Sequence, residues 1–206
     1  VTGEHAKVHT KPFVAGLKQP IEHYCVAVER VRYVGEPVAI VVAQDRYIAE
    51  DALEKIHVTY QPLAAVVDPE KSIASAAPVL HEAVGSNLLS DRTFIYGAPD
   101  EAFLDSDHRV DITIRYPRNS CTPMECFVVV AEYNPAKGSY DVLANFQGPF
   151  TLHSVMALAL GVPANRLRLR TPPDSGGSFG VKQAVFPYVV AMALASRLVC
   201  RPVKWV

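Results

Sequence analysis

The sequence predicts an α+β fold made of two modules. In the first half of the chain, two runs rich in β-branched residues flank the turn signal Gly35-Glu36-Pro37, and a segment with helical periodicity follows them. In the second half, apolar and polar residues alternate from Val110 to Tyr116, as expected of a half-exposed strand. A long apolar helix is expected from about residue 182 to residue 198. Strands and helices are therefore expected in both halves.

Composition limits the classes of protein that fit. The chain has 206 residues, of which 50% are apolar, enough to bury one large core or two modest ones. Lys and Arg (20) nearly cancel Asp and Glu (21), which argues against a nucleic-acid partner. The longest apolar stretch, 185–199, falls short of the roughly 18 residues of a membrane span. With no secretory segment near the start and only four cysteines, a cytoplasmic protein with reduced thiols is expected.

The first module is expected to span residues 1–81, with its natural start upstream. Residues 1–30 lack periodicity and are predicted to be irregular. Segments 31–34 and 38–43 are predicted to pair as strands around the turn, and 57–60 to form another strand. Between them, Asp45 can cap a helix with one apolar face, formed by Ile48, Ala52, Leu53 and Ile56.

Residues 82–106 are interpreted as a linker with a short helix at 100–104, and residues 107–206 as the second module. Turn residues 134–138 predict a hairpin between two strands. Gly161 and Pro163 are typical of the end of a helix. In order, the expected elements are strands 110–116, 127–133 and 140–146, helix 152–160, strand 166–170, a loop at 171–180 and the helix 182–198.

The loop Gly176-Gly177-Ser178-Phe179-Gly180 is the most distinctive motif. It lies between a predicted strand and a predicted helix, where backbone N–H groups converge and the helix dipole favours anions. The alternative is a tight connection that needs glycine for its backbone angles. The loop also satisfies GxSxG, the nucleophile motif of α/β-hydrolases, but no Asp, Glu or His follows Phe179, so a serine hydrolase is a remote alternative.

Other candidate groups give weaker signals. Cys121 and Cys126 have the spacing of two iron–sulfur ligands, but the third expected position holds Val129. His5 and His9 are interpreted as surface histidines. Glu125 enters an apolar run and should have a partner, which is either structural or catalytic. Gln147 closes a strand, where turn formation alone could explain it.

Five segments form a set in chain order: VRYVGEPVAIVVAQDRYIAEDALEKIHVTY (31–60), CTPMECFVVVAEYNP (121–135), FQGPF (146–150), DSGGSFGVK (174–182) and RPVKWV (201–206). Together they resemble the molybdopterin-binding large subunit of the xanthine dehydrogenase, aldehyde oxidase and carbon monoxide dehydrogenase family. The first segment resembles the a/b hammerhead domain of that family. The others resemble the beginning of its mixed α/β molybdenum-cofactor domain.

The resemblance implies a cofactor site. Gln147 matches a glutamine that hydrogen-bonds an oxygen ligand of molybdenum, and Phe179 matches a phenylalanine beside the metal. Phe179 and Gln183 would line the substrate pocket. Gln183 stands where purine-oxidising members carry glutamate, and Ser178 and Val181 stand where glycine is usual. The cofactor-binding residues implied in this way are Gln147, Gly148, Gly176, Gly177, Ser178, Phe179 and Gly180.

The resemblance also implies an activity and partners. A molybdenum hydroxylase of this family hydroxylates an aldehyde or N-heteroaromatic carbon with oxygen from water, and electrons pass to [2Fe–2S] clusters and FAD on partner domains or subunits. The base glutamate is expected beyond Val206, so this chain alone should be inactive and hold no molybdopterin or its cytosine dinucleotide. Its partners would be the rest of the molybdenum subunit, the iron–sulfur and FAD parts, a small-molecule substrate and, in a homo-oligomer, further copies. The alternative is a non-catalytic assembly or interaction module.

Overall fold

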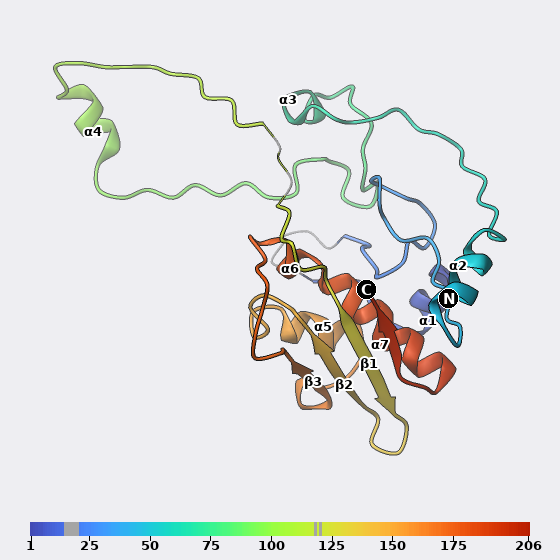
Figure 1. Cartoon of the computed structure of the whole chain (residues 1–206). Coiled ribbons are helices and arrows are strands. Elements are labelled where there is room, and N and C mark those ends of the chain that lie inside the picture. The colour runs from blue at the N-terminus through green and yellow to red at the C-terminus, as the bar shows by residue number, and fades with distance from the viewer. Residues whose placement is uncertain (15–20, 118, 120) are drawn as a thin grey trace.

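The computed structural model describes residues 1–14, 21–117, 119 and 121–206 (Figure 1). Short helices dominate the first half, and the second half contains every strand assigned within these residues. In chain order, the elements are α1 (Gly3–His9), α2 (Arg46–Leu53), α3 (Pro69–Ser72), α4 (Pro99–Leu104), β1 (Val129–Asn134), β2 (Ser139–Ala144), α5 (His153–Ala159), the 3-10 turn η1 (Ala164–Arg166), β3 (Leu167–Arg170), α6 (Val181–Ala184), α7 (Phe186–Val199) and β4 (Val203–Trp205).

The sheet has four strands in the order β3-β2-β1-β4. β1 and β2 form the predicted hairpin, with Val129 opposite Ala144, and Gly138 takes a positive φ of 56° in its turn. β3 runs parallel to β2, so the chain must cross over between them, and α5 provides that crossover. β4, which the sequence did not predict, pairs antiparallel with β1.

The core lies between the sheet and α7. Val190 and Ala193 of the helix and Val129 of β1 are fully buried, and Figure 1 shows α5 and α7 together on one face of the sheet. Each fully buried valine side chain contributes about 1.5–3 kcal/mol. Residues 189–196 of α7 are all buried, so this middle part of the helix is covered on every side.

The predicted long helix is divided into α6 and α7. The break falls at Val185, and Pro187 occupies the first turn of α7, where no backbone N–H is needed for the helix. The loop at 171–180, α5 and β3 agree with the predictions from sequence. Of the helices in the described part of the chain, α7 is the longest at 14 residues, and none is long and apolar enough to cross a membrane.

Three predictions for the first module are wrong. Residues 3–9 form α1 instead of irregular chain; the part of that segment at 15–20 lies outside the described residues. Segments 31–34 and 38–43 do not pair, because Ile40 is instead hydrogen-bonded to Val1. The Ile40 N–H donates to the Val1 carbonyl at 2.8 Å, and the Val1 amine donates to the Ile40 carbonyl at 2.7 Å. The turn at Gly35 is confirmed, with φ of 94°.

The helix after Asp45 is confirmed as α2, and the Asp45 carboxylate accepts from the N–H of Ile48 at 2.9 Å. The helix ends at Leu53, so Ile56 lies beyond it. Residues 57–60 are not a strand, and Tyr60 is 58% exposed. The first module packs on the second through Phe13, whose ring meets that of Phe186 edge-on at 4.8 Å.

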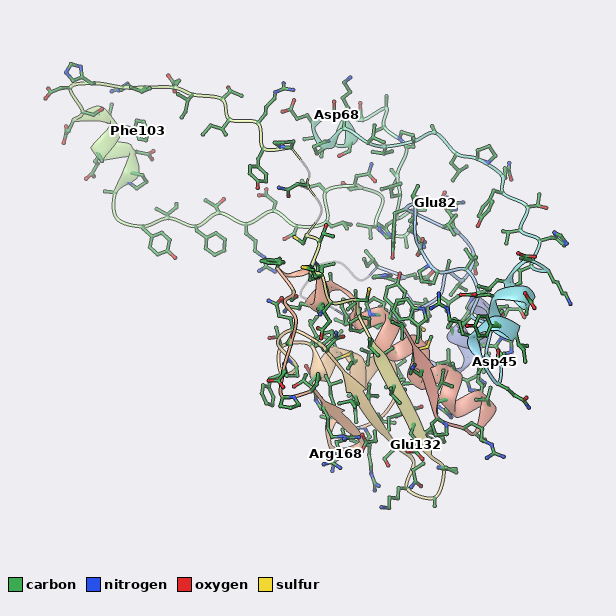
Figure 2. All side chains as sticks on the ribbon, in the orientation of Figure 1. Asp45, Asp68, Glu82, Phe103, Glu132 and Arg168 are labelled. Atoms are coloured by element: carbon green, nitrogen blue, oxygen red, sulfur yellow. The ribbon has the colours of Figure 1, made fainter. Side chains whose placement is uncertain are left out.

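Residues 84–117, here called the arm, leave the body of the molecule and carry α4 at their far end (Figure 1). Figure 2 shows Phe103 of α4 at this tip, apart from the sheet. The short helix is confirmed, but the predicted strand at 110–116 is wrong. Its alternating pattern is present, yet no described segment lies beside it, and Val110 and Ile114 are 84% and 77% exposed. A strand requires a partner for its backbone groups.

Candidate cofactor site

The sheet topology brings Gln147 close to the glycine-rich loop. β2 ends at Ala144 and β3 at Arg170, and because the two strands are parallel, their carboxyl ends lie at the same edge of the sheet. Gln147 follows the first strand and the loop at 171–180 follows the second. Ligands of α/β proteins commonly bind where such strand ends meet.

A direct hydrogen bond joins the two segments. The N–H of Gly180 donates to Oε1 of Gln147 at 3.0 Å, and the N–H of Gln147 lies 3.5 Å from the carbonyl oxygen of Lys182. The side-chain nitrogen of Gln147 has no partner among the described residues and remains available as a donor. The orientation of the carboxamide is therefore set by the loop.

The loop depends on unusual backbone angles. Gly177 and Gly180 have φ of 93° and 95°, which glycine adopts without steric cost. Phe179 has φ of 53°, in a region where a non-glycine residue costs about 1–3 kcal/mol. Its ring is 76% exposed and lies 3.7 Å from the position of a Cβ added at Gly177. Phe179 is thus exposed at the surface on a strained backbone.

The loop presents consecutive hydrogen-bond donors. Gly176 N–H donates to Glu125 and Gly180 N–H to Gln147, but the N–H groups of Gly177, Ser178 and Phe179 have no partner in the part of the chain that the structure describes. Successive free N–H groups form a concave anion-binding surface. With the Gln147 amide beside them, these donors fit an anionic, oxygen-rich group.

The helix dipole contributes little to this fit. The loop leads into α6, which has only four residues, and the longer α7 begins after the break at Val185. The expectation that a long helix would add its dipole at the loop is wrong, because Pro187 starts a separate helix. Anion binding here depends on individual N–H groups.

Glu125 has the partner that the sequence could not identify. Its Oε2 accepts from the ammonium of Lys182, from Nδ2 of Asn145 at 2.8 Å and from the N–H of Gly176 at 3.1 Å. The hydrogen bond from Lys182 is the main cause that lowers the pKa of Glu125 from its ordinary value, followed by those from Asn145 and Gly176. Glu125 is therefore ionised and paired at neutral pH.

Lys182 and Asn145 belong to this site although sequence analysis did not select them. Lys182 is only 1% exposed, and Asn145 also accepts from the N–H of Val128 at 2.8 Å and donates to the carbonyl of Cys126 at 2.8 Å. A lone lysine at the start of an apolar helix was the available signal, since a buried ammonium needs a carboxylate.

The remaining candidates lie at the margins of the loop. Gly148, with φ of 63°, starts a turn in which its carbonyl accepts from the N–H of Thr151 at 3.0 Å. Gln183 lies on α6, half-buried, and its N–H donates to the Gly180 carbonyl at 3.2 Å. Ser178 accepts from the N–H of Lys182 at 3.0 Å, and no described histidine bonds to it, so the hydrolase alternative lacks a base.

Metal ligation by protein side chains finds no support. Cys121 and Cys126 are exposed free thiols, and His5 accepts from the Thr2 N–H at 3.2 Å. Among the described residues, no group of three or more His, Cys, Asp or Glu side chains could hold a metal. A hollow of about 1470 Å³ lies in the first module between 27–34 and 58–67 and contains none of the site residues above. Exposed extended chain frames it, so it does not define a ligand site.

Family comparisons agree with this geometry. The model of the molybdopterin cofactor-binding domain matches residues 80–206, and the model of the aldehyde oxidase and xanthine dehydrogenase a/b hammerhead domain matches residues 1–64. The chain belongs to the xanthine dehydrogenase and aldehyde oxidase family of molybdopterin-binding subunits. The resemblance seen in the five sequence segments is thereby confirmed, as is the α+β class. Members of this family are molybdenum-dependent oxidoreductases that bind a molybdopterin cofactor.

Individual relatives of this family match nearly the whole chain. It is 35% identical to the carbon monoxide dehydrogenase large chain of Hydrogenophaga pseudoflava, over 97% of this chain and 26% of that one. It is 34% identical to the nicotine 6-hydroxylase large subunit of Paenarthrobacter nicotinovorans, over 90% and 25%. The structure of quinoline 2-oxidoreductase from Pseudomonas putida 86 superposes with a TM-score of 0.83 at 28% identity, covering 100% of this chain and 26% of that one. The chain thus spans about a quarter of the length of these family members.

Proposed function

We propose that Gln147 and the loop 176–180 form one wall of the molybdenum-pterin site of a molybdenum hydroxylase. The observation that carries the proposal is the 3.0 Å hydrogen bond between Gly180 N–H and Gln147 Oε1. It holds the carboxamide nitrogen beside the free N–H groups of the loop. A neutral amide in that position can donate to an oxygen ligand of the metal without adding charge.

Each residue has a separate role in this proposal. Gln147 orients an oxygen ligand, and the backbone of 176–180 together with Gly148 packs against the pterin and its anionic oxygens. Phe179 supplies an apolar face beside the metal and, with Gln183, borders the substrate. When bound, the molybdenum-pterin group would supply the redox chemistry of hydroxylation with oxygen from water, with [2Fe–2S] clusters and FAD as electron acceptors.

The proposed substrate is an aldehyde or an N-heteroaromatic compound. Relatives named for nicotine and quinoline act on nitrogen heterocycles, which supports this class. Gln183 argues against a purine, because a glutamine cannot supply the negative charge that a carboxylate would offer to such a substrate. Any contact that it makes with substrate is a hydrogen bond.

The chain would work as one part of a larger assembly. We assign 1–81 to the hammerhead-like domain, 82–106 to a linker and 107–206 to the first part of the cofactor domain. The general base and the remaining pterin contacts are assigned to other parts of the large subunit, and the redox partners to iron–sulfur and FAD subunits. The isolated chain should then hold no molybdenum. The exposed arm favours the alternative of an interaction module for the isolated chain. Molybdenum analysis of the isolated 206-residue chain separates the two, because stoichiometric molybdenum would favour a competent site and its absence a non-catalytic module.

Replacement of Gln147 by alanine tests the proposal in the assembled enzyme. Loss of one donor to a charged reacting centre typically lowers kcat about 100-fold or more. We expect Gln147→Ala to lower kcat by that order while the near-stoichiometric molybdenum content, measured by elemental mass spectrometry, is retained. The matched control is Gln61→Ala, at an exposed glutamine of the first module. Unchanged turnover in Gln147→Ala, or a wild-type enzyme without molybdenum, would refute the assignment.

A further inference from the structure

Three donors from separate parts of the fold meet on one carboxylate oxygen. Oε2 of Glu125 accepts from Lys182 of α6, from Asn145 just after β2 and from the N–H of Gly176 at the start of the loop. Lys182 is 1% exposed while the Glu125 side chain is 36% exposed, so the ammonium is the more deeply buried partner. A buried ammonium requires a compensating carboxylate, and Glu125 is the one that it contacts among the described residues.

Glu125 also packs directly beneath the loop backbone. A Cβ added at Gly176 would lie 2.5 Å from Cβ of Glu125, so no side chain fits at that position. Gly176 is thus required for close approach, whereas Gly177 and Gly180 are required for their positive φ angles. The start of the loop rests on Glu125 through both a hydrogen bond and a van der Waals contact.

The end of the loop is tied to the same carboxylate. Lys182 directly follows Val181 in α6, its N–H donates to Oγ of Ser178, and its carbonyl faces the N–H of Gln147. Both ends of the segment 176–182 are therefore attached to Glu125, and the three free N–H groups lie between these attachments. Glu125 itself makes no described contact with Gln147 or with those free groups.

We propose that Glu125 and Lys182 are positioning residues that clamp the glycine-rich loop and thereby set the geometry of its donors toward the cofactor. The effect of the clamp on the cofactor rests on the function proposed above. The clamp itself does not depend on that function. Because the pair is neutral overall, it fixes the loop without adding net charge beside an anionic group. Neither residue touches the reacting atoms.

Amide hydrogen exchange on the full 206-residue chain tests the clamp without any cofactor. In Glu125→Gln, exchange of the amides at Gly176 and Gly180 should accelerate at least tenfold, and by a larger factor than exchange of the amides in β1 and β2. The double variant Glu125→Gln/Lys182→Met removes both charges and should show the same loosening even if the single variant folds poorly. The control Asp141→Asn breaks an exposed ion pair of the same sheet and should leave the loop unchanged. Wild-type exchange at Gly176 in the double variant would overturn the clamp.

A second readout in the assembled enzyme distinguishes positioning from simple stability. We expect the double variant to keep the substrate KM, to lower kcat about tenfold and to broaden the electron paramagnetic resonance signal of reduced molybdenum. An unchanged signal and unchanged kcat in a folded variant would contradict the positioning role. A wild-type enzyme without molybdenum would contradict the proposed function, while the exchange experiment would still decide on the clamp.

Discussion

Glu125 gives the site a defined response to acid. Its pKa is lowered first by the hydrogen bond from Lys182, so the carboxylate is favoured in the folded state. A group with a lowered folded pKa stabilises the fold above its unfolded value, about 4.3 for Glu, and that contribution is lost as the pH falls through the folded pKa. The affected pH window therefore lies in the acid range, below its ordinary pKa.

We predict that Glu125→Gln destabilises the chain at pH 7 and destabilises it less at pH 3, which lies below the ordinary pKa of glutamate, because the stabilisation linked to the lowered folded pKa is diminished there. Urea unfolding at both pH values, followed by circular dichroism, measures the difference. A destabilisation of equal size at pH 7 and pH 3 would contradict the assigned ion pair. The exposed residue Glu132, which Figure 2 shows on the sheet, provides a control as Glu132→Gln.

Gly176 is the second residue with a specific consequence. Because an added Cβ would lie 2.5 Å from Glu125 Cβ, Gly176→Ala must shift the backbone or the glutamate. We expect a loss of about 1–3 kcal/mol in the free energy of unfolding, as for other overpacked positions. Gly138→Ala is the control, since Gly138 has a positive φ but open space around it. Denaturant titration should show the larger loss at Gly176.

At the scale of elements, one serine connects α7 to the sheet. Ser196 is fully buried, accepts from the N–H of Tyr133 in β1 at 3.0 Å and donates to the carbonyl of Arg201 at 2.7 Å. The second bond holds the turn that leads into β4. Ser196 thus links the helix to β1 and to the turn before β4.

We predict that Ser196→Ala costs about 1–3 kcal/mol, because it leaves two backbone groups without their partner. The exposed Ser154→Ala on α5 should change stability by no more than about 0.5 kcal/mol. Thermal or urea unfolding of the two variants gives the comparison. Equal stability of both variants would mean that water replaces the Ser196 hydroxyl.

Elements with local partners could be predicted from the sequence, and elements with distant partners could not. The β1–β2 hairpin was visible because a turn of a few residues joins two apolar runs. β4 was missed since it is only three residues long and pairs with a strand more than sixty positions earlier in the chain. Segment 110–116 shows that alternation alone does not make a strand. In the site, glycine spacing indicated the loop, but no local pattern could connect Glu125 to Lys182.

For the whole molecule, the arm is the feature with the strongest consequence in solution. Apolar side chains on it are largely exposed, among them Phe94, Tyr96, Phe103, Val110, Ile112 and Ile114. Exposed apolar segments of this extent mark interaction surfaces or aggregation-prone sites. In the two relatives compared, most of the large subunit lies outside the region matched by this chain.

We predict that limited chymotrypsin digestion of the isolated chain cleaves first between residues 84 and 117 and leaves a resistant product from the sheet region. Mass spectrometry of the early products identifies the cut sites. Initial cleavage within β1–β2 would show that the arm is protected.

The double variant Ile112→Lys/Ile114→Lys should lower concentration-dependent self-association, measured by light scattering. Lys replacements at the exposed polar residues Thr113 and Asn119 should not lower it.

The parallel pairing of β2 and β3 also has an evolutionary consequence. Residues 171–175 connect β3 to the donor-bearing loop, and no hydrogen bond attaches them to the described remainder of the fold. Insertions or deletions in this connector would shift the loop donors relative to Gln147 while the strand pairing beneath them stayed intact. The placement of these donors can therefore change through the length of one short spacer.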